Sequence, residues 1–460
     1  MGDSRDNHQQ ARWPLLIPLL ALVCAPFVGG DLLTDDFVHV QRLTSVTGIS
    51  DVLLTPDAFR FYRPVTQAGL AIELALHGDR PVLFRVVNLA LHAAVLAMAL
   101  VVARLILLDE TAAALATLAF ALTPKAPAIV VLWISGRAEL LMALFTFASV
   151  AAWIMWIRRG GPRWLIAAAV AYVLAAASKE TAFLLPLLFV FVPNDSAPAT
   201  RRAAAIAMMV AVGAALFAWR SHTGALTPLS SDVHYDLLTG VARVLRSLRN
   251  YIGRMLPAPA LLIAVMAIAR TIDARRSTRA AGTYGIAVSM LVHPLVWMLL
   301  FLAPVLPIVA RSEIYLYLPT FGMCLVAAVI ARATLFGVAH HRAAVVAVGV
   351  FVLALAGYQA SRAATMHDDL DFSARLVAAL RADTDLAASG EPITLVPADL
   401  ETERYLQDSI GGYLYSVLHR AFPQGSVTGV TEYSGMRVTG STRRVQCRYR
   451  DRRVTLSIEH

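Results

Sequence analysis

The sequence predicts an all-α protein that crosses a membrane many times and carries a small α+β domain at its carboxyl end. Hydrophobic residues make up 58% of the 460 residues and charged residues only 15%, whereas charged residues approach about a quarter of an ordinary soluble chain. The hydrophobic residues also gather in long runs that short polar segments separate. A polytopic membrane protein accounts for both observations.

About eleven of these runs are long enough to cross roughly 30 Å of hydrocarbon. The first begins at Trp13 and ends at Gly30. No small-x-small cleavage site follows it, so we expect a retained span rather than a secretory signal. The predicted spans are residues 13–30, 84–107, 111–131, 140–157, 164–178, 181–193, 203–219, 257–270, 283–303, 314–332 and 343–361.

The arginines between the runs predict the orientation. With a cytoplasmic amino end, alternation places the basic loops near Arg158, Arg201, Arg275 and Arg342 on the cytoplasmic side of an inner (plasma) membrane. These loops explain the net charge of +9, so nucleic-acid binding is not expected. The longer polar segments then lie outside: residues 31–83, 123–139, 220–256, 304–313 and everything after about 362.

The chain divides into two predicted domains. Residues 1–361 form the transmembrane domain, whose first extracytoplasmic loop is 31–83, and residues 362–460 form an extracytoplasmic tail. Within the first loop, residues 65–80 have the amphipathic spacing of a helix at the membrane surface. The tail pattern predicts a helix to about residue 386, a strand at Ile393–Val396, a helix near 400–420 and a hairpin of strands 445–450 and 454–458.

An acidic pair, Asp35 and Asp36, directly follows the first span. Carboxylates placed where a helix leaves the bilayer stay ionised and face whatever a membrane-embedded substrate presents there. We therefore expect these two aspartates to be catalytic residues for chemistry on a lipid-linked substrate.

Polar side chains in or beside the spans also require partners, because a charge at mid-bilayer costs roughly 2.5–3.5 kcal/mol. Arg85, Asn88 and His92 share one face of the second span. An interhelical hydrogen-bond seam and a substrate-facing stripe explain this face about equally well. Lys179 and Glu180 lie between two short apolar stretches that leave no room for a solvated loop, so we expect them to be paired.

Cationic side chains on the outer side offer donors for phosphate oxygens. Alternation places four of them on the side of the acidic pair: Arg63, Arg137, Lys179 and Arg311. The sequence thus predicts a cationic ring around an acidic pair. Anchoring at the membrane interface is the alternative for Arg137 and Glu139, and an aromatic belt is the alternative for Tyr315 and Tyr317. The other residues expected to line the site are His92, Asn88, Glu139, Glu180, Glu313 and Tyr315.

Taken together, these motifs resemble the ordered motifs of the GT-C glycosyltransferases. Besides the acidic pair, they are Tyr62-Arg-Pro64, Arg85-Val-Val-Asn-Leu-Ala-Leu-His92, Trp133-Ile-Ser-Gly-Arg137, Ser178-Lys-Glu-Thr181 and Tyr315-Leu-Tyr-Leu-Pro319-Thr-Phe-Gly322. The likeness runs from about residue 13 to 361 and is to bacterial proteins similar to the tetratricopeptide-containing protein O-mannosyltransferases. Two features depart from that pattern. Thr123-Pro-Lys125 replaces the His-Pro of such relatives, and the tail lacks a repeat of about 34 residues.

The resemblance implies an inverting transfer of a hexosyl or pentosyl group from a polyprenyl phosphate donor to an acceptor at the outer membrane face. The acceptor is a protein hydroxyl, a lipid or an envelope glycan. One of Asp35 and Asp36 would be the general base on the acceptor hydroxyl, and the other would orient the acceptor or a metal ion. The cationic ring would stabilise the leaving phosphate. The reaction is either metal-free or assisted by a divalent cation at the two carboxylates.

Two other function classes stay open at this point. A transporter or flippase of lipid-linked material also has many spans and buried charges. It more often shows paired halves or spans broken by Gly or Pro at corresponding places, which this sequence does not show. A noncatalytic scaffold whose tail binds a partner in the cell envelope would leave the acidic pair as a solvated loop edge.

Overall fold

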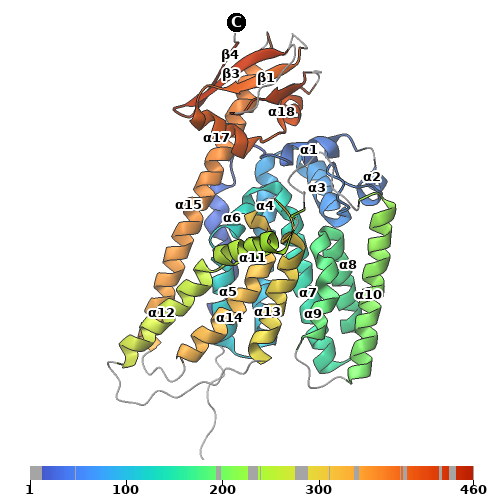
Figure 1. Ribbon diagram of the computed structural model, residues 1–460, viewed down its shortest axis with the longest axis vertical. Helices are drawn as coiled ribbons and strands as arrows, with labels where there is room; N and C mark the ends of the chain where they lie inside the picture. Colours follow the sequence, from blue (N-terminus) through green and yellow to red (C-terminus); the bar gives the residue numbers. More distant parts are fainter. Residues whose placement is uncertain are drawn as a thin grey trace, which may run out of the picture.

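The computed structural model describes residues 13–46, 48–192, 198–225, 237–238, 240–274, 289–309, 311–335, 341–383, 385–386, 391–423, 427–434 and 442–458. The amino end before Trp13 and the predicted basic loop around Arg275 lie outside these residues. The described chain forms a bundle of long helices, and a small domain that contains a sheet stands at one end of the bundle (Figure 1).

The bundle consists of helices, and the loops at its end nearer the sheet are also partly helical. In order along the chain, the helices are η1 (Trp13–Phe27), α1 (Asp36–Thr44), α2 (Ile49–Leu54), α3 (Pro64–His77), α4 (Pro81–Leu107), α5 (Glu110–Ala121), α6 (Ala126–Leu132), η2 (Ile134–Gly136), α7 (Arg137–Arg159), α8 (Pro162–Ser178), η3 (Glu180–Leu184), α9 (Leu185–Val190), α10 (Ala199–His222), α11 (Val241–Met255), α12 (Pro257–Ala274), α13 (Ser289–Leu302), η5 (Ala303–Val305), η6 (Glu313–Leu316), α14 (Tyr317–Leu335) and α15 (His341–Ala382).

The described residues contain fewer full-length membrane-crossing helices than the roughly eleven spans that the sequence predicts: five, or up to seven. Five helices are long and apolar enough to cross a membrane: Pro81–Leu107, Ile134–Arg159, Ala199–His222, Glu313–Leu335 and Arg342–Ala382. Two further pairs of helices are long and apolar enough only when each pair is counted as one bent span. The helix axes bend by 61° between α5 and α6 and by 48° between α11 and α12. The shorter apolar helices are Pro14–Phe27, Pro162–Ser178, Glu180–Val190 and Met290–Val305. Each predicted stretch overlaps one of these segments, and the polytopic fold class is confirmed.

Aromatic side chains fill the middle of the bundle. The ring of Phe147 stacks on Trp297 with a centroid separation of 5.4 Å and meets Phe321 edge-on at 4.8 Å. Phe120 packs against Tyr317 at 5.2 Å. Aromatic pairs add to the stability that their buried area provides, and this cluster joins α5, α7, α13 and α14.

The polar face of α4 holds the broken segment between α5 and α7. Arg85 Nε donates to the carbonyl of Leu132 at 2.8 Å, and Asn88 Nδ2 donates to the carbonyls of Val130 and Trp133, each at 3.2 Å. His92 Nδ1 lies 2.6 Å from the hydroxyl of Tyr317. Backbone that leaves a helix at membrane depth needs such internal partners. Of the two interpretations of this face, these contacts favour the hydrogen-bond seam.

Gly136, at the end of the broken segment, permits a close backbone approach. A Cβ at this position would lie 2.7 Å from Val130 Cα and 2.8 Å from the Val130 carbonyl oxygen. We expect Gly136→Ala to lower the free energy of unfolding by about 1–3 kcal/mol, the usual cost of overpacking, and to lower the Tm of the detergent-purified protein. The control is Gly349→Ala, since a Cβ there meets nothing within 4 Å. Equal Tm values for the two variants would contradict this prediction.

The tail contains a four-stranded sheet of order β2-β1-β3-β4, in which β1 is parallel to β2 and β3, and β4 is antiparallel to β3. Its elements are β1 (Ile393–Pro397), α17 (Leu400–Ser409), α18 (Leu414–Ala421), β2 (Gly429–Thr431), β3 (Arg443–Arg450) and β4 (Arg453–Ile458). The predicted strand and hairpin are confirmed. The single helix expected near 400–420 is wrong: Gly411 has a φ of +57°, which ends α17 and separates it from α18.

The tail is held against the loop that follows η1. α15 runs from the bundle into the tail without interruption (Figure 1), so the predicted boundary at residue 361 falls inside one helix. The Asp31 N–H donates to the Leu370 carbonyl at 3.1 Å, and the Thr34 N–H donates to the Ser409 carbonyl at 2.8 Å. Asp31 also pairs with Arg420 of α18 at 2.8 Å. These contacts fix the loop that carries the acidic pair.

Candidate active site

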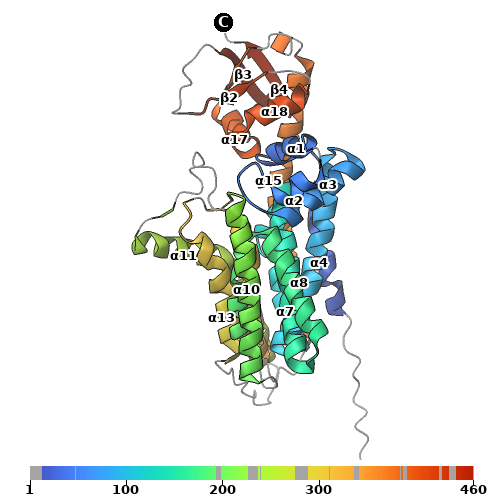
Figure 2. The same cartoon turned by 90° about the vertical axis from the view of Figure 1, so that its right-hand side faces the viewer.

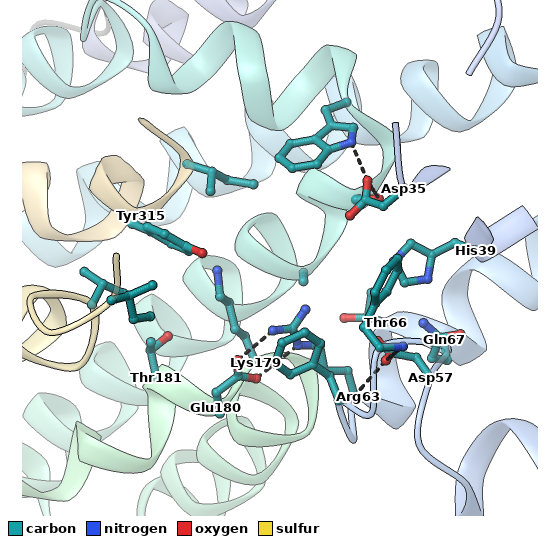
Figure 3. Close-up of a pocket in the computed structure, with 18 of the residues that line it drawn as sticks. Asp35, His39, Asp57, Arg63, Thr66, Gln67, Lys179, Glu180, Thr181 and Tyr315 are labelled. Carbon is teal, nitrogen blue, oxygen red and sulfur yellow. Dashed lines mark hydrogen bonds and ion pairs between the residues drawn. The ribbon is translucent and has the colours of Figure 1, made fainter. Parts of the chain in front are cut away.

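A cavity of about 310 Å³ lies where the bundle meets the loops below the tail (Figure 3). Its lining comes from α1, α3 and the segment before it, the Trp133–Ser135 turn, the start of α7, the turn between α8 and η3, the end of α10, η5, η6 and the tail. Segments far apart in the sequence therefore meet at one place. In Figure 3, Asp35 and His39 lie on one side of the cavity, whereas Lys179, Thr181 and Tyr315 lie on the other.

Asp35 places its carboxylate in the cavity at the start of α1. Its Oδ1 accepts hydrogen bonds from Trp133 Nε1 at 2.8 Å and from Ser135 Oγ at 3.0 Å. Burial, and then the neighbouring charge of Asp36, raise the pKa of Asp35 above its usual range. A carboxylate in this state is a better proton acceptor than an exposed aspartate.

Asp36 is fully buried and lies behind Asp35, outside the cavity lining. Its Oδ1 accepts from the N–H and the hydroxyl of Ser135, at 2.8 and 2.6 Å, and its Oδ2 accepts from the Ile134 N–H at 3.1 Å. Burial raises the pKa of Asp36, although the bonds from Ser135 and the charge of Arg85 oppose this shift. Asp36 therefore fixes η2 and, through Ser135, the position of Asp35.

Three cationic side chains line the cavity: Arg63, Lys179 and Arg220. Arg63 holds Glu180 with two bonds, from Nε at 3.0 Å and from Nη2 at 2.6 Å, and Arg220 Nη1 lies 3.4 Å from the same carboxylate. A guanidinium held by a carboxylate keeps other donors in a fixed direction. Glu180 thus positions two arginines at the cavity wall.

Lys179 comes from the turn between α8 and η3. Its Nζ pairs with the buried carboxylate of Glu139 and lies 5.2 Å from the centre of the Tyr315 ring. Figure 3 shows the amino group directed toward Tyr315. The expectation that Lys179 and Glu180 have partners is thereby confirmed, and their partners come from α7, α10 and the segment before α3.

The structure does not bring the whole predicted cationic ring together. Arg137 is buried away from the cavity, where its Nη2 donates to Glu73 Oε2 and to the Phe84 carbonyl, each at 3.0 Å, and its Nε donates to Asn88. Arg311 is exposed and lies outside the cavity lining. The ring must therefore be corrected to Arg63 and Lys179, with Arg220 as a third member.

Four residues that were predicted to line the site lie outside the cavity lining: Glu313, His92, Asn88 and Glu139. Glu313 pairs with Lys125 at 3.2 Å and with Arg254 at 3.3 Å, which ties η6 to α6 and α11. Lys125 belongs to the Thr123-Pro-Lys125 segment, where the sequence departs from the family pattern. Its ammonium thus serves as a partner of Glu313 in this chain.

Sequence reasoning missed Arg220, His39, Asp57 and Tyr413, which all line the cavity. Arg220 could have been found, because an arginine at the outer end of a predicted span opposes the positive-inside rule and needs a reason. Asp57 Oδ1 accepts from the Phe61 N–H at 2.8 Å, which shapes the turn before α3. Tyr413 belongs to the tail and reaches the cavity only through tertiary packing, for which the sequence carries no local signal.

The acidic pair does not fit a shared metal site. Asp36 turns both oxygens to donors of the Ile134–Ser135 backbone. Within the described ranges, no group of three or more His, Cys, Asp or Glu residues is placed to hold a metal ion.

No protein-family model and no curated protein matches the chain. Among solved structures, ArnT from Cupriavidus metallidurans bound to undecaprenyl phosphate is similar over 97% of this chain and 98% of that chain, with 14% sequence identity and a TM-score of 0.51. ArnT in the apo state is similar over 96% and 94%, with 14% identity and a TM-score of 0.49. The first similarity shows that the chain shares the membrane fold of ArnT.

Proposed function

Starting from the GT-C-like fold, we propose that the protein is a membrane glycosyltransferase that moves a sugar from a polyprenyl phosphate donor to an acceptor hydroxyl. The observation that carries the proposal is one cavity, at the end of the bundle, that contains Asp35, Lys179, Arg63 and Arg220. A similar fold is known with undecaprenyl phosphate bound, in ArnT. A half-buried carboxylate, Asp35, and fixed cations are the two kinds of group that transfer from a sugar phosphate requires.

The reaction follows from the positions of these groups. Asp35 accepts the proton of the acceptor hydroxyl as its oxygen bonds to the anomeric carbon. The bond between that carbon and the phosphate oxygen breaks, its electron pair stays on the phosphate, and polyprenyl phosphate leaves. Attack from the face opposite the phosphate inverts the anomeric configuration. Because Asp35 and Lys179 lie on opposite sides of the cavity (Figure 3), the acceptor and the phosphate can occupy opposite faces of the sugar.

Lys179, Arg63 and Arg220 stabilise the negative charge that develops on the phosphate. Glu139 and Glu180 hold these cations before the substrate arrives, so little reorganisation is needed during the reaction. Tyr315 lies beside Lys179 and limits the direction in which its ammonium can point. In this assignment Asp35 is the base, and Asp36 acts through Ser135 as a positioning residue.

We place the reaction at the outer face of the inner membrane, with the amino end cytoplasmic. Tyr413 of the tail lines the cavity, so the tail and the cavity lie at the same end of the bundle. A tail outside the membrane therefore puts the cavity on the outer side as well. The aromatic cluster around Phe147 and Trp297 is buried and closely packed. A packed interior agrees better with a transferase, which works at the membrane surface, than with a transporter, which needs a path through the bundle.

The pH dependence of transfer tests the role of Asp35. The base acts only when it is deprotonated, so the rate rises with pH through the pKa of Asp35 and falls about tenfold for each pH unit below it. Because burial and Asp36 raise that pKa, we expect the acidic limb at a higher pH than an ordinary aspartate pKa of about 3.9 gives. The measurement is transfer by the purified protein at saturating donor. A limb at the ordinary value would contradict the assignment.

The function itself is tested with a panel of radiolabelled donors. Membranes that contain the protein receive polyprenyl phosphates carrying different hexosyl or pentosyl groups, and the label is then followed into protein, lipid and glycan fractions. Incorporation from one donor establishes the transferase and identifies the acceptor class. If folded, membrane-inserted protein incorporates no label from any donor, the proposal fails and a transporter or scaffold becomes the better interpretation.

A further inference from the structure

α11 carries a strip of arginines that the proposed reaction does not use. Arg243, Arg246 and Arg249 are all exposed. Across the ranges that the structure describes, no ion pair joins any of the three to another side chain. They recur at every third position, and successive helical residues turn by about 100°, so the three guanidinium groups form a continuous strip along one side of α11.

The remaining surface of α11 is shared between the protein and exposed apolar side chains. Tyr251 and Met255 are buried in a cluster with residues of α13 and η5. Between this buried face and the arginines, Val241, Leu245 and Leu256 are 76%, 56% and 43% exposed. Exposed apolar side chains beside a strip of arginines are typical of a helix in the headgroup region, with its apolar side toward hydrocarbon.

The place of α11 in the fold agrees with this pattern. Its axis bends by 48° from that of α12, and Figure 2 shows it projecting sideways from the bundle, nearer the end that carries the tail. Arg254 pairs with Glu313 of η6 at 3.3 Å. The helix is thus anchored through the half that contains Tyr251, Arg254 and Met255, while the other half reaches into the surroundings of the bundle.

We propose that Arg243, Arg246 and Arg249 form a binding site for the phosphate groups of anionic phospholipids in the leaflet around the cavity. Guanidinium groups donate paired hydrogen bonds to phosphate oxygens, and an arginine next to an anionic membrane surface strengthens binding about fivefold. The site is separate from the cavity, since none of the three arginines lines it. It is nevertheless adjacent, because α11 is joined through Glu313 to η6, which also carries Tyr315.

Native mass spectrometry of the full chain in detergent, with equal amounts of phosphatidylglycerol and phosphatidylcholine added, tests this site. The wild-type protein should retain phosphatidylglycerol preferentially. The variant with Arg243→Gln, Arg246→Gln and Arg249→Gln should bind phosphatidylglycerol about a hundredfold more weakly, because each arginine contributes a factor of about five. The variant with lysine at the same three positions should keep the preference, because its charge is unchanged.

The matched control removes three exposed arginines from the sheet, Arg448, Arg450 and Arg453, and should leave the lipid preference intact. Unchanged preference in the α11 glutamine variant, or equal loss in the sheet variant, would overturn the proposal. Displacement of phosphatidylglycerol by equimolar undecaprenyl phosphate would also overturn it, because the site would then belong to the donor. If the triple variant fails to fold, Arg246→Gln alone should lose about fivefold. The readout does not depend on sugar transfer.

Discussion

Asp35→Asn is expected to lower the rate of sugar transfer by about 10²–10⁴-fold, the usual contribution of a general base, without loss of the fold. The asparagine Oδ1 can still accept the hydrogen bonds that Trp133 Nε1 and Ser135 Oγ give to Asp35. What disappears is the carboxylate that takes the acceptor proton. The substitution also removes the charge repulsion with Asp36, so the Tm should stay the same or rise.

The adjacent carboxylate supplies the contrast for this prediction. The two carboxylate oxygens of Asp36 both accept hydrogen bonds from the Ile134–Ser135 backbone. In Asp36→Asn an amide NH₂ group replaces one of these oxygens, so one backbone N–H loses its acceptor at a cost of about 1–3 kcal/mol. We expect this variant to lower the Tm. Transfer rates and Tm values of the two purified variants check both expectations. An Asp35→Asn protein that keeps more than about a tenth of wild-type transfer, against the loss expected for a general base, would exclude Asp35 as the base.

Lys179→Gln is expected to lower transfer by about 10²–10³-fold, the cost of removing one group that stabilises developing charge. The single substitution also leaves the buried carboxylate of Glu139 without its ion-pair partner. Breaking a buried ion pair lowers the free energy of unfolding by about 3–5 kcal/mol. The double variant Lys179→Gln with Glu139→Gln removes both charges. It should therefore recover stability but not transfer.

The control for this prediction is Arg311→Gln. Arg311 is a cation two residues before η6, which lines the cavity, but Arg311 itself is exposed and lies outside the lining. We therefore expect transfer within about twofold of wild type, the size of a surface effect. Rates for the three variants, measured at saturating donor with a Tm for each, separate a catalytic from a structural role. Full transfer by the double variant would show that Lys179 only neutralises Glu139.

Local patterns predicted much of the fold. The apolar runs located the spans because a helix must be apolar over the whole bilayer thickness. The alternation at Ile393–Val396 and in the terminal hairpin located the strands. The predicted helix near 400–420 was wrong because a single left-handed residue, Gly411, decides where α17 ends. Such an effect depends on one φ angle and not on periodicity.

The site was predictable only where its chemistry is local. Asp35, Lys179 and Glu180 stood out because charged residues so close to apolar runs require a reason. The prediction that Arg137 belongs to the cationic ring was wrong because its partner, Glu73, lies 64 residues away in the sequence. No residue near Arg137 in the sequence indicates this pairing. Tyr413 reaches the cavity from the tail. Partners that meet through tertiary packing are visible only in the folded chain.

The most direct test of the account is the release of polyprenyl phosphate by the purified protein during transfer of a labelled sugar. We predict one polyprenyl phosphate for each sugar transferred, an inverted anomeric configuration in the product, and loss of both products in Asp35→Asn but not in Arg311→Gln. Retention of configuration, or unchanged release by Asp35→Asn, would contradict the assignment of Asp35 as the base of a transfer from polyprenyl phosphate.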